Sequence, residues 1–251
     1  INHYQSTPET VLSCCKKFAI KRVYNFRWKN RIYFRDNRIK IINFYEYDFN
    51  CKEAWYKYGE IHRDDIDQKT GFTLPAIIWK DGSKEWHKDG ELHRDDIDPE
   101  TGLILPAEID TECETKYWYK DGKINRDDID PKTGLTLPSE LCNNLIKCWY
   151  KDSELHRDDI DPETGITFYA YEIDGEERWY KYDKIHRDEI DPKTGFTLPA
   201  IIYAHKQLKN WYNNGQLHRY EIDPESCNIL PAKIMWNRKD EWYKNGVQFY
   251  P

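Results

Sequence analysis

The sequence has no long apolar run, a single methionine and few aliphatic residues, and only 39% of its 251 residues are hydrophobic. No stretch approaches the ~18 consecutive apolar residues of a membrane-spanning helix, and no signal peptide is visible. We therefore predict a protein without a membrane partner. Because the chain begins at Ile1 and not at Met, we also expect that residues upstream of it have been removed.

Regular cysteine spacing is absent as well. The seven cysteines form no C-x-x-C pair and do not recur at one position of any pattern. A disulfide framework or a zinc site would require fixed spacing. We therefore predict reduced thiols in an intracellular compartment, with no bound metal and no cofactor.

Charge is plentiful but uneven along the chain. Residues 1–54 carry 11 Lys/Arg and 5 Asp/Glu, whereas residues 55–251 carry 27 and 40. The balance of −13 in the second segment should repel nucleic acid and anionic membranes. Only the basic N-terminal segment, which also holds aromatic residues, could contact nucleic acid. A solvated surface, or pairing with the acidic segment, is the favoured interpretation of this stretch.

Aromatic residues make up 15% of the chain, and they reveal an internal repeat. The unit reads W-Y-K-D-G-x-L-H-R-D-D-I-D-P-x-T-G-x-T-L-P-A-x-I before a variable turn. Its tryptophan recurs every 30 to 32 residues, at Trp55, Trp86, Trp118, Trp149, Trp179, Trp211 and Trp242. In repeat proteins, stacked neighbours bury a face that one unit cannot bury alone. We expect these rings to lie above one another in one hydrophobic column.

The turn chemistry of the unit predicts β-hairpins. Asp89-Gly90, between alternating residues, is a two-residue hairpin turn. The segment from Asp98 to Gly102 places Pro and Gly where a second turn needs them, and Lys80 to Ser83 is a third. The strand expected from Leu103 to Ile109 contains Pro106, which indicates an edge or a bulge. Each unit thus supplies three or four short strands.

The predicted fold is therefore all-β, an elongated tandem-repeat array of β-hairpins. It has about six 31-residue units in residues 55–251 and ends in a half unit from Trp242 to Pro251. Residues 1–54 form a small, partly helical N-terminal cap. Strand edges or the terminal half unit could support self-association.

Without Asp96 to Ile104, the second copy reads W-H-K-D-G-E-L-H-R-D-L-P-A-E-I plus a variable turn, 23 residues in all. This pattern resembles the variant form of the membrane occupation and recognition nexus (MORN) repeat, in arrays that occur in large DNA viruses and some bacteria. The resemblance covers residues 55–251, and the I-D-P-E-T-G insert departs from it. It implies hairpin arrays that bind proteins without catalytic residues. A viral member would act in the host cytoplasm or the virion.

Residues 1–54 differ from the repeats. The series T-P-E at residues 7–9 is a favourable helix start, and apolar residues between 11 and 18 would share one helical face. The series L-S-C-C-K-K-F…W-K-N-R is similar to the second half of an F-box, which implies docking of residues 1–54 to the adaptor of a cullin ubiquitin ligase. The alternatives are a helical or irregular cap and, for residues 33–54, a degenerate repeat.

The tripeptide His-Arg-Asp recurs in the units, and we interpret it as structural. Stacked units would place His over His and Arg beside Asp, so that charges pair between neighbours. Protein kinases carry the same tripeptide, but D-F-G, V-A-I-K and a Gly-rich loop are absent here. No catalytic residue is predicted. The candidate ladder, which is also the candidate binding surface, comprises the seven tryptophans with His62, His93, His156, His186, His218, Arg63, Arg94, Arg126, Arg157, Arg187 and Arg219.

Two patterns leave ligand alternatives open. The series D-D-I-D-P-E-T-G places oxygen atoms at alternate positions, as calcium sites do, but its central Pro favours a turn. The W-Y hairpins resemble choline-binding repeats of bacterial surface proteins, which implies aromatic cages that hold a small cation. The function we predict is non-enzymatic, a protein–protein interaction or structural scaffold. The ubiquitin-ligase adaptor and the aromatic-cage binder are the alternatives.

Overall fold

The computed structural model describes residues 22–24, 31–35, 38–42, 51–203, 208–236 and 238–251. Within these residues the chain consists of strands, turns and connections without any helix, so the predicted all-β array of hairpins is confirmed. The helix predicted for the N-terminal cap falls outside the described residues. The chain divides into two compact units, unit 1 (residues 1–123) and unit 2 (residues 124–251).

The strands are short and follow the repeat. Unit 1 contains β1 (Arg22–Tyr24), β2 (Arg31–Arg35), β3 (Arg38–Ile42), β4 (Cys51–Lys57), β5 (Glu60–Ile61), β6 (Ile77–Trp79), β7 (Lys84–Glu85), β8 (His87–Lys88), β9 (Glu91–Leu92), β10 (Glu108–Asp110), β11 (Thr115–Tyr117) and β12 (Tyr119–Lys120), and β13 (Lys123–Ile124) lies at the boundary. Unit 2 contains β14 (Glu140–Cys142), β15 (Ile146–Cys148), β16 (Tyr150–Lys151), β17 (Glu154–Leu155), β18 (Tyr171–Ile173), β19 (Glu176–Arg178), β20 (Tyr180–Lys181), β21 (Lys184–Ile185), β22 (Ile201–Tyr203), β23 (Leu208–Asn210), β24 (Tyr212–Asn213), β25 (Gln216–Leu217), β26 (Lys233–Ile234), β27 (Trp242–Lys244) and β28 (Val247–Phe249).

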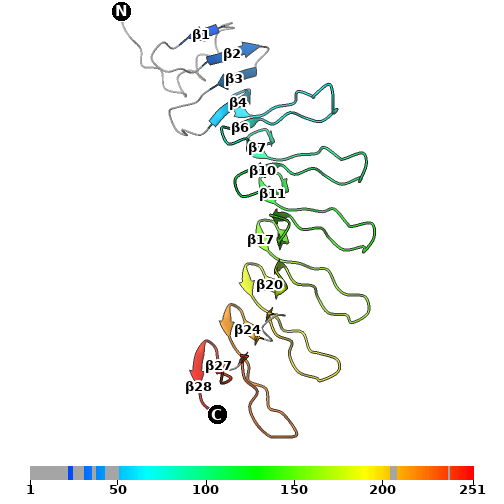
Figure 1. Ribbon diagram of the computed structural model, residues 1–251, viewed down its shortest axis with the longest axis vertical. Helices are drawn as coiled ribbons and strands as arrows, with labels where there is room; N and C mark the ends of the chain where they lie inside the picture. The colour runs from blue at the N-terminus through cyan, green and yellow to red at the C-terminus, as the bar shows by residue number, and fades with distance from the viewer. Residues whose placement is uncertain (1–21, 25–30, 36–37, 43–50, 204–207, 237) are drawn as a thin grey trace, which may run out of the picture. The chain divides into compact units, whose positions relative to one another are not determined.

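The first five repeats each contribute one hairpin to a main sheet. From the second repeat onward the W-Y hairpin is separate from that sheet, whereas in the first repeat β5 pairs with the main-sheet strand β4. In unit 1 the main sheet has the order β1-β2-β3-β4-β6-β7-β10-β11, and in unit 2 the order β14-β15-β18-β19-β22-β23-β26. The paired neighbours are antiparallel, and in unit 2 every second pairing, such as β19 with β22, skips the two strands of a W-Y hairpin. The W-Y hairpins, such as β16–β17 and β20–β21, are separate two-stranded sheets. We call the connection between each W-Y hairpin and the next strand of the main sheet, residues 156–170 in the fourth repeat, the long loop. Within unit 2, the long loops of successive repeats project to the same side of the main sheet (Figure 1).

The predicted turns form as their residues require. Asp89 and Gly90 have φ values of 51° and 89°, so the W-Y hairpin closes through a turn with two left-handed residues. At the tip of the long loop, Gly102 has φ 72°, and its N–H donates to the carbonyl of Asp98 at 2.8 Å. In the sixth copy Cys227 occupies the position of this glycine, with φ 56°.

The strand predicted from Leu103 to Ile109 is wrong in its extent. The long loop holds a single bridge between Ile97 and Ile104, and β10 begins only at Glu108. Pro106 lies between the two, where no ladder N–H is needed, and its carbonyl accepts a hydrogen bond from Arg94 Nη1 at 3.1 Å. The proline therefore marks a connection and not a sheet edge.

The described part of residues 1–54 is continuous with the repeats. The predicted boundary at residue 54 falls inside β4, which pairs with β3 on one side and with β6 on the other. Backbone hydrogen bonding therefore extends the main sheet of unit 1 into this segment.

The buried positions of the repeats include one small residue and one tryptophan. Ala76, Ala107, Ala170, Ala200 and Ala232 are at most 1% exposed, and Ser139 replaces alanine in the third copy. The tryptophans between the first and the last, from Trp86 to Trp211, are 6 to 7% exposed. In unit 2, the backbone N–H of Trp149 donates to the carbonyl of Ala170 at 2.8 Å, which places the aromatic residue beside the small one.

Candidate functional site

The six tryptophans from Trp86 to Trp242 tie their own repeats to the long loop that precedes each of them. The indole Nε1 of Trp149 donates to the carbonyl of Thr136 at 2.9 Å. The same bond joins Trp86 to Thr73, Trp118 to Ile104, Trp179 to Thr167, Trp211 to Thr197 and Trp242 to Ile229. Because a buried indole N–H needs an acceptor, this bond fixes the ring orientation in these copies.

The arginine of His-Arg-Asp covers the tryptophan of its own repeat. The guanidinium of Arg157 lies 4.1 Å from the ring centre of Trp149, and its Nη1 donates to the carbonyl of Tyr169 at 3.3 Å. Its Nε donates to Asp159 at 2.8 Å. Four further pairs, at 3.7 to 4.0 Å, are Arg63–Trp55, Arg94–Trp86, Arg187–Trp179 and Arg219–Trp211. The indole faces of these five copies therefore carry a guanidinium, whereas we expected a continuous stack of rings.

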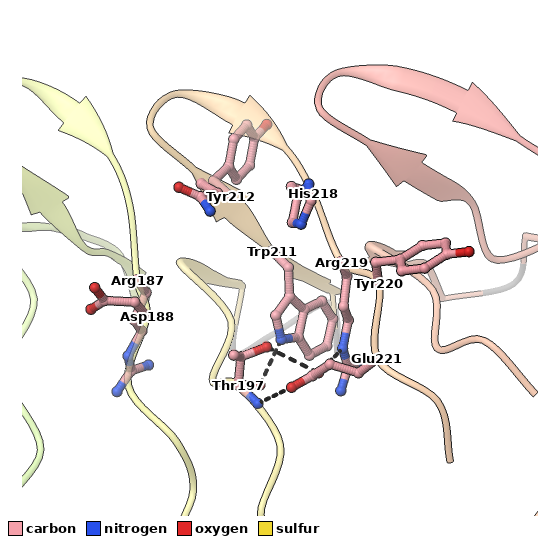
Figure 2. A pocket seen from close by; sticks show the side chains of 10 residues that line it. Arg187, Asp188, Thr197, Trp211, Tyr212, His218, Arg219, Tyr220 and Glu221 are labelled. Carbon is pink, nitrogen blue, oxygen red and sulfur yellow. Dashed lines mark hydrogen bonds and ion pairs between the residues drawn. The ribbon is translucent and has the colours of Figure 1, made fainter.

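In four repeats the carboxylate beside the arginine completes the link to the preceding repeat. Asp159 accepts hydrogen bonds from both the backbone N–H and the hydroxyl of Thr136, in the preceding repeat. The same link joins Thr73 to Asp96, Thr167 to Glu189 and Thr197 to Glu221. Figure 2 shows the last of these beside Trp211 and Arg219. We call this set of tryptophan, arginine, carboxylate and threonine the inter-repeat ladder.

The ladder differs from the predicted one in its partners. We expected Arg and Asp to pair between neighbouring repeats, but Arg157 and Asp159 pair within one repeat, and the threonine makes the connection. Burial lowers the pKa of the Arg157 guanidinium, and the hydrogen bond to Asp159 opposes this shift. Sequence reasoning missed the threonine, although T-L-P recurs in three of the six repeats and gave the signal.

The histidines join the tips of neighbouring W-Y hairpins and do not stack on one another. The backbone N–H of Asp121 donates to Nδ1 of His93 at 3.1 Å. The Nε2 atom of His93 lies 2.7 Å from Oδ1 of Asp95, and this hydrogen bond holds the ring within its own repeat. Equivalent backbone bonds join His62 to Asp89, His186 to Asn214 and His218 to Asn245. In the fourth copy the ring of His156 stacks on Tyr182 instead, with 4.3 Å between centroids.

An outward-facing row runs along the long loops. Residues alternate between the two faces of an extended chain, so Asp158 and Ile160 point outward where Arg157 and Asp159 point inward. The isoleucines of the six copies are 47 to 57% exposed: Ile66, Ile97, Ile129, Ile160, Ile190 and Ile222. Hydrogen bonds from Lys151 and His156 lower the pKa of Asp158, so this carboxylate stays ionised. Sequence reasoning missed this row, although isoleucine stands at this position in all six copies.

Within unit 2, a hollow of about 200 Å³ lies between the fifth and sixth repeats of the chain (Figure 2). Its lining includes Trp211, Tyr212 and Tyr220, the residue types of an aromatic cage. The face of Trp211 that would hold a cation already carries the Arg219 guanidinium at 4.0 Å. The hollow is also smaller than the roughly 300 Å³ at which ligand pockets begin. It is therefore a by-product of the inter-repeat ladder.

The acidic tips of the long loops use their oxygen atoms within the turn. Asp161 accepts hydrogen bonds from the N–H of Glu163 at 2.9 Å and from the hydroxyl of Thr164 at 2.8 Å, and both lower its pKa. Among the described residues, no group of three or more His, Cys, Asp or Glu side chains is placed to hold a metal ion.

Comparison of the chain with protein-family models, curated proteins and solved structures gives no match. The described residues contain no helix long and apolar enough to cross a membrane. The fold and the inter-repeat ladder define the class as an all-β repeat protein built from hairpins. The F-box-like segment falls mostly outside the described residues. Its described part, Arg22–Tyr24 and Arg31, is β-strand.

Proposed function

We propose that the protein is a non-enzymatic interaction scaffold that presents the outward row of its long loops to another protein. The observation that carries the proposal is that, in the long loop after each tryptophan, inward-facing and outward-facing residues alternate and have different roles. The inward residues, such as Arg157 and Asp159, are engaged in the inter-repeat ladder. The outward residues, such as Asp158 and Ile160, are more than half exposed.

The chemistry of the His-Arg-Asp tripeptide supports a structural role. A general acid or base needs access to a substrate, and the arginines are held by a ring, a carboxylate and a carbonyl. The side chains of Arg157 and Arg187 are 5% exposed. We therefore assign no reaction to this tripeptide.

Two further points support the proposal. The resemblance to MORN-type arrays implies protein binding by stacked hairpins. The cysteines of the described residues, Cys51, Cys113, Cys142, Cys148 and Cys227, are thiols, as expected of a protein that works in a reducing compartment. We propose an intracellular location on this basis.

Photo-crosslinking in the native host tests the proposal. A photoreactive amino acid replaces Glu163 or Lys193, exposed residues at the tips of two long loops. The matched controls replace Glu154 or Lys184, which are also exposed but lie on the separate W-Y hairpins. We expect a crosslinked protein partner from the loop positions and little from the hairpin positions. Crosslinks from the hairpins alone, or from none of the four positions, would refute the proposed binding face.

A further inference from the structure

The outward row of unit 2 repeats one apolar side chain at a constant structural position. Its members are Ile129, Ile160, Ile190 and Ile222, with exposed fractions of 47, 56, 52 and 57%. A single exposed isoleucine is ordinary on a protein surface, but a line of apolar residues with a polar border is typical of an interaction site. Each isoleucine forms the isolated β-bridge of its loop with a residue of the opposite loop arm, so it occupies the same structural position in every copy.

The border of this row is acidic. The four loops at residues 126–134, 157–165, 187–195 and 219–227 carry 13 Asp/Glu and 6 Lys/Arg, a net charge of −7. Unit 2 as a whole carries 23 and 17, a net charge of −6. The loops therefore account for the negative charge of the whole unit. Asp158 and Asp188, two residues before their isoleucines, are 64 and 69% exposed.

The spacing between the isoleucines indicates the secondary structure of the partner. Each repeat adds two strands to the main sheet, so successive isoleucines lie about 10 Å apart. Residues seven apart on an α-helix are separated by about 10.5 Å and lie on one face. On a β-strand, residues of one face are separated by about 7 or 13 Å, which does not match. The row from Ile129 to Ile222 spans about 30 Å, the length of a helix of roughly 20 residues.

We propose that the outward row of unit 2 binds an amphipathic α-helix of another protein, with an apolar residue at every seventh position and Lys or Arg beside it. This inference rests on the proposed function and names the chemistry of the partner. A second copy of the same row is disfavoured, because it would bring Asp158 and Asp188 against other carboxylates. Nucleic acid is disfavoured by the charge of −7 on the loops.

Synthetic helices test this inference with the full chain. The probe is a peptide of about 28 residues, with leucine at every seventh position and lysines at the positions that flank it. One control peptide has the same composition with the leucines moved out of heptad spacing, and a second has glutamate in place of lysine. Fluorescence anisotropy should give a dissociation constant about tenfold lower for the probe than for either control. Binding of the probe should weaken as salt is added.

Protein variants locate the binding site. The variant I129T/I160T/I190T/I222T should bind the probe about tenfold more weakly. The matched control L145T/W236T/V247T removes residues that are 64, 63 and 68% exposed but lie outside the row, and it should leave binding unchanged. Thermal melting checks that both variants fold, and I160T/I190T replaces the fourfold variant if that one is unstable.

Absence of saturable binding by the heptad peptide, or equal binding after the row is removed, would overturn the inference. Equal binding of the glutamate peptide would overturn its electrostatic part. In each case, crosslinks from Glu163 and Lys193 would still report a protein partner, so the inference and the proposed function can fail separately.

Discussion

Two faces of the same five residues do different work in the fourth repeat. On the inward face, Arg157 pairs with Asp159, Asp159 binds the preceding repeat, and Asp161 closes the turn. On the outward face, Asp158 and Ile160 are more than half exposed. Because side chains of an extended chain alternate between faces, one short segment can hold the array together and present a surface. Mutations on the two faces should therefore separate stability from binding.

The largest effect is expected at the tryptophan on the inward side. Trp149→Ala should lower the free energy of unfolding by about 3–5 kcal/mol, because it empties a buried site and removes the Nε1 bond to Thr136. Chemical denaturation measures this change. Trp236→Ala is the control, since that ring is 63% exposed and should cause only a small loss. A melting temperature within a degree of wild type for Trp149→Ala would show that the inward face contributes little to stability.

Removal of the guanidinium should have the next largest effect. Arg157→Met keeps much of the side-chain volume but leaves Asp159 buried without its cation, at a cost of about 3 kcal/mol. Arg157→Lys should recover only part of the loss, because an ammonium group cannot stack on Trp149 and bond to Asp159 with the same planar geometry. Full recovery by lysine would show that charge alone matters. Denaturation of the three proteins at neutral pH decides between these outcomes.

A feature of the fold or of the inter-repeat ladder could be predicted from the sequence where nearby residues determine it. Turns are local, so Asp89-Gly90 and Gly102 were predicted with their left-handed conformation. The tryptophan period predicted the stacked hairpins and the buried rings. The partners of the ladder could not be derived, because Thr136 and Asp159 are 23 residues apart and meet only through the stacking of two repeats. The outward orientation of Ile160 could not be predicted either, since D-D-I-D-P has the composition of a turn.

The threonine of the ladder should give a moderate effect. Thr136→Val keeps the shape of the side chain and the backbone N–H bond to Asp159 but removes the hydroxyl donor. We expect a loss of about 1.5–3 kcal/mol, as for other hydrogen bonds to charged groups. Thr133→Val is the control, because its hydroxyl serves only the exposed turn at Asp130. Equal losses from the two variants would show that the inter-repeat bond carries no special weight.

The loop tips should show smaller effects of opposite sign. Cys227→Gly should stabilise the protein by about 0.5–1 kcal/mol, since cysteine at φ 56° is strained and the equivalent residue of other copies is glycine. Gly165→Ala should destabilise by about 1 kcal/mol, although a Cβ there meets nothing within 4 Å, because φ is 71°. The two melting curves should shift in opposite directions. Shifts of the same sign would show that contacts, and not backbone strain, decide the outcome.

The smallest effect on stability is expected on the outward face. Ile160→Thr keeps a β-branched side chain in the bridge to Thr167, and the isoleucine is 56% exposed. The free energy of unfolding should change by no more than about 0.5 kcal/mol. Ile201→Thr makes the same chemical change at a residue that is 4% exposed and should cost about 2 kcal/mol. Similar losses from both would mean that Ile160 belongs to the core. A small loss at Ile160 together with weaker helix binding would place its role on the surface.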